Sequence, residues 1–118
     1  RQLAAGRMVG VLLDQRTAAA SVDAPFFGHP APTPAVAAKL ALWRGLPVVP
    51  AALVREDGRW VARHLAPLVP GPGADARDGA QVAAFTARCN AALEELVRRN
   101  PAQWVWFHAR WDEERREA

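Results

Sequence analysis

The sequence predicts an α/β fold in which helices flank part of a mixed, mainly parallel sheet. An apolar run at residues 8–14 has the length and composition of a buried strand. An alanine-rich segment at 34–45 has the pattern of a helix, and a second apolar run begins at Val48. A strand, a helix and a strand in this order predict two parallel strands joined by a right-handed crossover.

The first predicted strand ends abruptly in three polar residues, Asp14, Gln15 and Arg16. In open α/β sheets, ligands gather outside the carboxyl ends of the strands. A carboxylate, an amide and a guanidinium offer a ligand an acceptor, a group that both donates and accepts, and a fixed cation. We therefore predict that these three side chains bind substrate.

A segment rich in proline and alanine follows at residues 16–34 and is predicted to form a rigid loop. Phe27 and Gly28 lie in this loop and are further candidates for contact with substrate. Thr33 is predicted to cap the next helix, with Pro34 at the first helical position, where a missing N–H costs nothing.

The helix predicted at 34–45 is apolar on most of its circumference and ends at Gly45, so we expect it to pack against the sheet. The next strand is expected at 48–54. A tight turn at 57–58 and a third strand at 59–65 would then pair back on it as a hairpin. This hairpin adds an antiparallel edge to the predicted sheet.

The second half of the chain is predicted to be mostly helical. After a loop rich in proline and glycine at 66–77, Asp78 and Gln81 form a capping-box pattern at the start of a helix. A shorter helix is expected within 100–111, and its Trp104 and Trp111 are expected to bury against the sheet rather than to lie at a bilayer interface. The apolar stripe of the longer helix consists of Val82, Phe85, Cys89, Leu93 and Leu96.

Composition excludes several classes of function. With 118 residues, 51% of them hydrophobic, the chain is typical of a folded domain, and a net charge of +3 without a basic stripe gives no support for nucleic-acid binding. The single cysteine, Cys89, excludes an internal disulfide and offers no metal-ligand spacing, so we predict neither a metal site nor a cofactor. No apolar run approaches the roughly 20 residues that span a bilayer, so any membrane contact is expected to be peripheral.

Two histidines require comment as possible catalytic bases. His29 lies in the predicted loop, but no serine or cysteine stands beside it to be activated. His108 and Glu113 have a His-x4-Glu spacing, which in acyl transfer would supply a base and a carboxylate that orients it. We interpret this match as accidental, because on a helix Glu113 would lie about 140° around from His108. Asp112, about one turn away, instead explains a surface pair with His108.

Several short elements follow one another in a characteristic order. They are Val9 to Gln15, Phe26-Phe27-Gly28, Thr33 before an alanine-rich helix, Leu46 to Pro50, Asn90 with Leu93 and Glu94, and Asn100-Pro101-x-Gln103-Trp104-x-Trp106-x-His108-x-Arg110-Trp111. In order and spacing, across nearly all of the chain, they resemble the lipid A biosynthesis acyltransferases. These are the lauroyl and myristoyl transferases within the glycerolipid, or lysophospholipid, acyltransferase superfamily.

The resemblance implies a glycerolipid acyltransferase-like fold and an enzyme on the cytoplasmic face of the inner membrane. Such an enzyme moves a fatty acyl group from acyl carrier protein to a lipid A precursor. The family's catalytic His-x4-acid motif precedes all of the matching elements, so no residue here inherits it. We therefore expect residues 1–118 to be the carboxy-terminal part of one acyltransferase domain, inactive without the amino-terminal catalytic part.

The resemblance also bears on individual residues. It implies that Asp14 and Gln15 belong to a loop that shapes the acceptor site, and that Pro50 marks a strand beside the acyl site. From their charge, Arg16 and Arg110 are predicted to contact an anionic headgroup.

Two alternatives stay open from the sequence. A related enzyme would acylate another glycolipid, such as a phosphatidylinositol mannoside, with the same fold. The alternative from a different class is a non-catalytic module that binds lipid or a protein partner. That alternative predicts that no His-x4-acid motif precedes Arg1.

Overall fold

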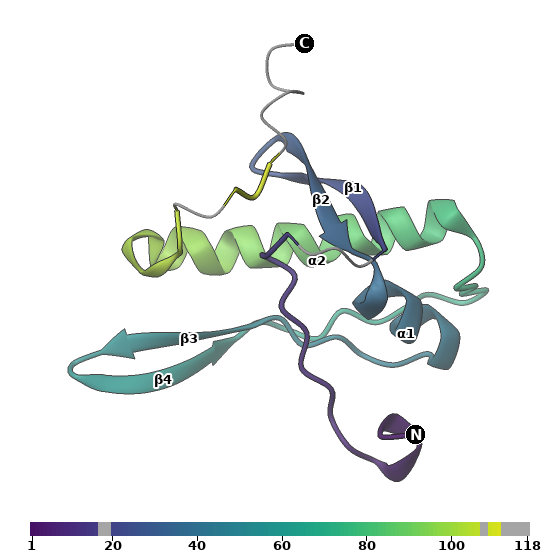
Figure 1. Ribbon diagram of the computed structural model, residues 1–118. Helices are drawn as coiled ribbons and strands as arrows, with labels where there is room; N and C mark the ends of the chain where they lie inside the picture. Colours follow the sequence, from purple (N-terminus) through teal and green to yellow (C-terminus); the bar gives the residue numbers. More distant parts are fainter. Residues whose placement is uncertain (17–19, 107–108, 112–118) are drawn as a thin grey trace.

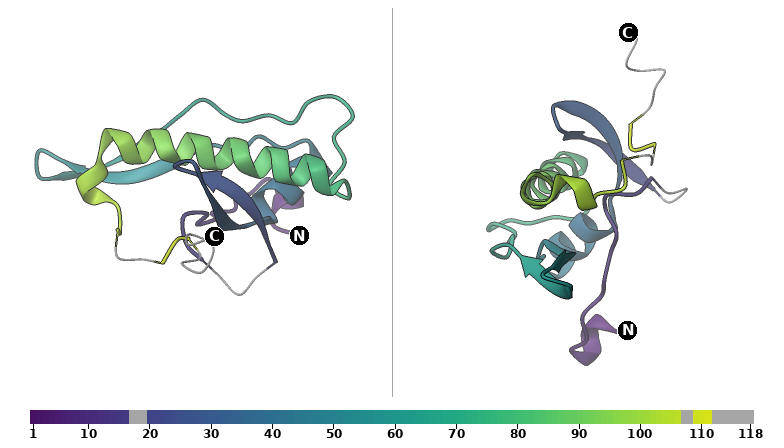
Figure 2. Two further views of the ribbon diagram at one scale, coloured as in Figure 1. Left: turned by 90° about the horizontal axis from the view of Figure 1, so that it is seen from above. Right: turned by 90° about the vertical axis from the view of Figure 1, so that its left-hand side faces the viewer.

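Two β-hairpins and two α-helices make up the computed structural model, which describes residues 1–16, 20–106 and 109–111 (Figure 1). Helix α2 lies between the hairpins, with β1 and β2 on one side and β3, β4 and α1 on the other (Figure 2). Short 3-10 turns occur at Leu3–Ala5 and Pro101–Gln103. The main elements are β1 (Ser21–Phe26), β2 (His29–Pro34), α1 (Val36–Arg44), β3 (Ala51–Glu56), β4 (Arg59–His64) and α2 (Gly79–Arg99).

The α/β class predicted from the sequence agrees with the structure, but the mainly parallel sheet is wrong. In the described residues β1 pairs with β2 and β3 pairs with β4, and both pairs are antiparallel. The apolar run at 8–14 belongs to no strand of the described chain. It runs as extended backbone, and Leu13 and Val11 pack against α1 and α2. Met8, Val9 and Leu12 are exposed, so side-chain burial accounts for the apolar character of only part of this run.

The rigid loop predicted at 16–34 is wrong over 21–34, where the structure has the β1–β2 hairpin. Prolines form the pairs Pro25↔Pro30, Asp23↔Pro32 and Ser21↔Pro34, which alternate along the ladder. In a two-residue hairpin the closing pair, here Phe26↔His29, is hydrogen-bonded, and the pairs alternate from there along the ladder. The prolines therefore fall at the non-hydrogen-bonded pairs. Their missing N–H groups thus leave the ladder intact.

The predicted cap at Thr33 is also wrong, because Thr33 is a buried residue of β2. Helix α1 begins two residues later than predicted, and its N-cap residue Ala35 makes no side-chain capping bond. The predicted end of the helix is confirmed. Gly45 has a left-handed backbone with φ 64°, which glycine adopts without a steric cost.

The second hairpin agrees with its prediction, although β3 lies later than predicted and β4 ends one residue earlier. Strand β3 starts at Ala51 because Val48 instead makes an isolated bridge with Leu68 in the following loop. The predicted turn at 57–58 is confirmed. Asp57 and Gly58 both have positive φ, at 49° and 73°, as a two-residue hairpin turn of the primed type requires.

Helix α2 is the element that the sequence predicts best. The Asp78 carboxylate accepts hydrogen bonds from the backbone N–H groups of Ala80 at 2.9 Å and Gln81 at 3.4 Å, which confirms Asp78 as the predicted cap. The reciprocal half of the capping box differs, because the Asp78 N–H donates to the Asp75 carbonyl oxygen and Gln81 Oε1 accepts from the Asp75 N–H. Four residues of the predicted stripe are buried and Leu93 is partly buried. The helix predicted within 100–111 is wrong over the described residues, where a single 3-10 turn gives way to extended backbone at Trp104.

The buried side chains form two clusters on either side of α2. The first fills the space between Leu13, α1 and the start of α2. The second joins the β1–β2 hairpin to the end of α2 through Phe26, Ala31 and Val97. Trp104 and Trp111 are partly buried and pack against this second cluster, which confirms their predicted packing, although Trp104 reaches it from extended backbone.

Candidate functional site

An apolar pocket of about 710 Å³ is formed by the extended segment 7–14, α1, residues 46–54 and α2. This volume lies within the usual range for small-molecule sites. Side chains that line it include Val11, Leu13, Ala41, Val48, Leu53, Cys89 and Leu96. The pocket therefore suits a long aliphatic group better than a polar metabolite.

Polar groups gather at the place where Asp14 meets the chain that follows α2. Asp14, Asn100, Gln103 and Trp104 all line the pocket. The Trp104 Nε1–H donates a hydrogen bond to Asp14 Oδ2 at 3.0 Å. The other carboxylate oxygen of Asp14 has no hydrogen-bond partner among the described residues. The pocket thus combines aliphatic walls with one carboxylate that has a free acceptor atom.

Arg110 is completely buried between β2 and the second cluster. Its guanidinium donates to the carbonyl oxygen of Pro32 and, at 2.8 Å, to Thr33 Oγ1, and it lies 5.1 Å from the ring centre of Phe26. Burial lowers the pKa of Arg110, and the nearby Asp14 carboxylate opposes this shift. A headgroup contact for Arg110 stays a prediction, since its guanidinium is enclosed by the protein here.

Thr33 connects this arginine to α2. Its hydroxyl accepts hydrogen bonds from Arg110 and, at 3.0 Å, from Asn90 Nδ2, and it donates to the carbonyl oxygen of Ala31 at 3.0 Å. Thr33, Asn90 and Arg110 are all fully buried. Among the described residues, Asn90 Oδ1 and Arg110 Nε are buried without a partner. Sequence analysis missed this network, because its three members lie far apart in the chain.

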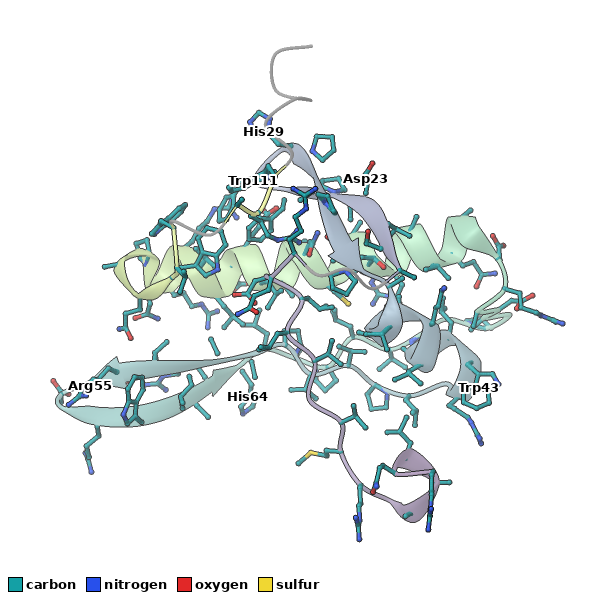
Figure 3. All side chains as sticks on the ribbon, viewed as in Figure 1. Asp23, His29, Trp43, Arg55, His64 and Trp111 are labelled. Carbon is teal, nitrogen blue, oxygen red and sulfur yellow. The ribbon has the colours of Figure 1, made fainter. Side chains whose placement is uncertain are left out.

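An aromatic cluster, defined as Phe26, Phe27, Trp104, Trp106 and Trp111, joins the β1–β2 turn to the segment after α2. The ring centres of Phe26 lie 5.5 Å from Trp104 and 5.7 Å from Trp111. Trp106 lies 4.6 Å from Trp104 and 6.4 Å from Phe27. Figure 3 shows Trp111 beside this hairpin. Because Trp104 binds Asp14, the cluster connects the Asp14 carboxylate to Phe27 through packed aromatic rings.

The Phe27–Gly28 turn is held on α2 by Glu94. Both turn residues have positive φ, and the Phe27 N–H donates to Glu94 Oε1 at 2.6 Å. Arg98 pairs with Glu94 at 3.3 Å and places its guanidinium 4.9 Å from the ring centre of Phe27. The contact between Glu94 and the turn was not predicted from the sequence. The spacing of Glu94 to Arg98 explains a surface ion pair equally well, so no local pattern identified its contact with the turn.

The predicted substrate-binding residues are only partly brought together. Phe27 belongs to the aromatic cluster, and Asp14 and Arg110 contact it. Gln15, Arg16 and Gly28 are exposed, the first two beside Asp14 and the third at the tip of the β1–β2 hairpin.

The histidine predictions have separate outcomes. His29 lies at the tip of the β1–β2 hairpin, where Figure 3 shows it directed away from α2. His108, Asp112 and Glu113 lie outside the described residues, so their predicted pairing stays a prediction.

The described residues offer neither a group of metal ligands nor a membrane-spanning helix. No three histidine, cysteine, aspartate or glutamate side chains in the described part of the chain come close enough to hold a metal ion. None of the helices within the described ranges combines the length and apolar composition needed to cross a membrane.

Cys89 lies on the pocket wall and should react slowly with iodoacetamide. Burial raises the pKa of its thiol to about 11, so at pH 8 the reactive thiolate is roughly 100-fold scarcer than for an exposed cysteine. Mass spectrometry of the folded chain should therefore show alkylation at least 100-fold slower than in urea. The rate should rise as the pH approaches 11, because the thiol then ionises. A folded chain that reacts at the unfolded rate at pH 8 would contradict this burial.

Comparison with known proteins places the chain in a family. The sequence model of the bacterial lipid A biosynthesis acyltransferases matches residues 1–113. A search of curated proteins found no match. The match confirms the predicted resemblance at the level of the family. Because it covers nearly the whole sequence, this chain belongs to the bacterial lipid A biosynthesis acyltransferase family.

Proposed function

We propose that the chain forms the acyl-binding wall of an enzyme that transfers a fatty acyl group from acyl carrier protein to a lipid A precursor. Membership of an acyltransferase family supports acyl transfer in general. The observation that carries the finer proposal is the aliphatic pocket with the Asp14 carboxylate among its few polar groups. The enzyme would act in peripheral contact with the cytoplasmic face of the inner membrane. The amino-terminal part of the same domain would supply the catalytic base.

The pocket walls give a physical basis for binding a lauroyl or a myristoyl chain. Each methylene group that leaves water contributes about 0.8 kcal/mol. Two additional methylene groups therefore change the binding free energy by about 1.6 kcal/mol, or slightly more than tenfold in affinity. Residues that line the pocket, such as Ala41 and Leu46, would set the preferred chain length.

The reaction is an exchange of a thioester for an ester. The acceptor hydroxyl oxygen attacks the thioester carbonyl carbon, a C–O bond forms and the C–S bond breaks. The hydroxyl proton passes to the base and then to the departing thiolate. In this scheme the free oxygen of Asp14 accepts a hydrogen bond from the acceptor lipid and orients its hydroxyl group.

Filling the pocket should weaken acyl binding. Ala52 is half-buried and lines the pocket, so Ala52→Phe should raise the dissociation constant of 11-(dansylamino)undecanoic acid at least tenfold. Ala62→Phe is the matched control, because Ala62 is exposed on β4 and does not line the pocket. It should change the constant less than twofold. Fluorescence titration measures both, and equal effects of the two variants would remove the pocket as the acyl site.

The acceptor is tested by the lipids of a strain that lacks the gene. Mass spectrometry of extracted lipids should show a lipid A species with one acyl chain fewer. Loss of an acyl chain from a phosphatidylinositol mannoside would instead identify that acceptor. An unchanged lipid profile would favour the non-catalytic module and overturn the proposal.

A further inference from the structure

We infer that Trp104 is a positioning residue for the carboxylate of Asp14. The inference rests on the proposed function, in which this carboxylate orients the acceptor hydroxyl. An indole N–H can only donate, and the Nε1–H of Trp104 donates to Asp14 Oδ2 at 3.0 Å. The bond therefore fixes one carboxylate oxygen and leaves the other available to a ligand.

Asp14 needs such a support because of where it lies in the fold. It ends an extended segment that belongs to no strand of the described chain, so no ladder fixes its backbone. Within the described ranges, its hydrogen bond to Trp104 is the one that its side chain makes. The rotamer of Asp14 therefore depends on a residue 90 positions away in the sequence.

Trp104 is itself held on several sides, as a positioning residue must be. Its ring meets Trp106 edge-on at 4.6 Å and 89°, and Phe26 at 5.5 Å. Its neighbour Gln103 is bound to strand β3. The Gln103 side-chain amide accepts from the Arg55 N–H at 2.7 Å and donates to the Arg55 carbonyl oxygen at 3.0 Å.

The two adjacent residues therefore join both walls of the pocket. Gln103 is bound to the β3 wall and Trp104 to the Asp14 wall, and both residues line the pocket. A group that orients a reactant must be held within about half an ångström of its productive position. Loss of the indole N–H should therefore affect the catalytic step more than the binding of substrate.

The test is a kinetic comparison of two conservative variants of the full-length enzyme. Trp104→Phe keeps an aromatic ring and removes the N–H, and it should lower kcat about tenfold with KM changed less than twofold. Trp43→Phe is the matched control, because Trp43 is exposed on α1, makes no contact with the aromatic cluster among the described residues and does not line the pocket. Its kcat and KM should stay within twofold of the parent values.

A double variant separates positioning from a general structural role. If Trp104 acts through Asp14, adding Trp104→Phe to Asp14→Ala should lower kcat less than twofold further. A second tenfold loss in that background would overturn the inference, and so would an unchanged kcat in Trp104→Phe alone. A parent enzyme that transfers no acyl group would instead remove the proposed function and this inference with it.

Nuclear magnetic resonance gives a second readout that does not require the Trp104 variant to fold. In the ¹⁵N-labelled enzyme, Asp14→Ala should move the indole Nε1–H resonance of Trp104. The chemical shift of the Trp106 indole N–H should stay the same as in the parent enzyme, within the error of measurement. An unmoved Trp104 resonance would show that the bond to Asp14 does not exist in solution, and would overturn the inference.

Discussion

Replacing Phe26 with alanine should lower the free energy of unfolding of this chain by about 3–5 kcal/mol. Phe26 is fully buried and lies at the centre of the aromatic cluster. Its ring centre is 4.8 Å from Phe27, 5.5 Å from Trp104 and 5.7 Å from Trp111. Truncation removes these contacts and leaves a cavity beside the guanidinium of Arg110. A loss of this size is a large fraction of the 5–15 kcal/mol that stabilises a typical domain.

Urea unfolding followed by tryptophan fluorescence measures this loss. Trp43→Ala serves as the control, because Trp43 lies on α1 with 63% of its surface exposed. Its replacement should change the free energy of unfolding by less than about 1 kcal/mol. If the two variants lose equal stability, Phe26 is not the centre of a packed cluster.

Replacing Thr33 with valine should lower the free energy of unfolding by about 3 kcal/mol or more. Valine keeps the shape of threonine but removes the oxygen that accepts from both Arg110 and Asn90. Two buried donors, one of them charged, then lose an acceptor. Each such loss costs about 1–3 kcal/mol, with charged groups at the upper end.

Thr86→Val is a matched control for this substitution. Thr86 is as buried as Thr33, but its hydroxyl only donates to the carbonyl oxygen of Val82 within α2, at 2.7 Å. Its loss leaves no donor unpaired, so the free energy of unfolding should fall by less than about 1.5 kcal/mol. Equal losses in the two variants, measured by urea unfolding, would contradict the role of Thr33 as an acceptor for Arg110.

Elements that depend on local chemistry were predictable from the sequence. The apolar stripe of α2 and its Asp78 cap are separated by a few residues, and so are the two residues of the turn at 57–58. In each case the physical cause lies within one or two turns of chain. The prediction therefore needed no knowledge of distant partners.

Elements that depend on distant partners were not predictable. The run at 8–14 has the composition of a strand, but a strand also requires a neighbour, which no local pattern specifies. The prolines of β1 and β2 predict a loop, because the sequence does not show that they occupy alternate pairs of a ladder. Trp104 is extended rather than helical, because its ring packs on Phe26 and its N–H binds Asp14.

In the candidate site, too, the features with a local cause were predictable and those that depend on distant partners were not. Asp14 was identified because an apolar run ends there, and this is a local observation. Its partner Trp104 was assigned to the core alone, and Thr33 was assigned to a helix cap. Both errors have one cause, which is that their hydrogen-bond partners lie 57 to 90 residues away in the sequence.

These long separations have a consequence for the order of events during protein synthesis. Asp14 leaves the ribosome 90 residues before its hydrogen-bond partner Trp104, and Thr33 leaves it 77 residues before Arg110. Closing such distant contacts is slow, because the loop entropy must be overcome before the contacts form. The nascent chain therefore exposes the apolar walls of the pocket until Trp104 and Arg110 emerge, so chaperones that shield apolar surface would be needed most during that interval.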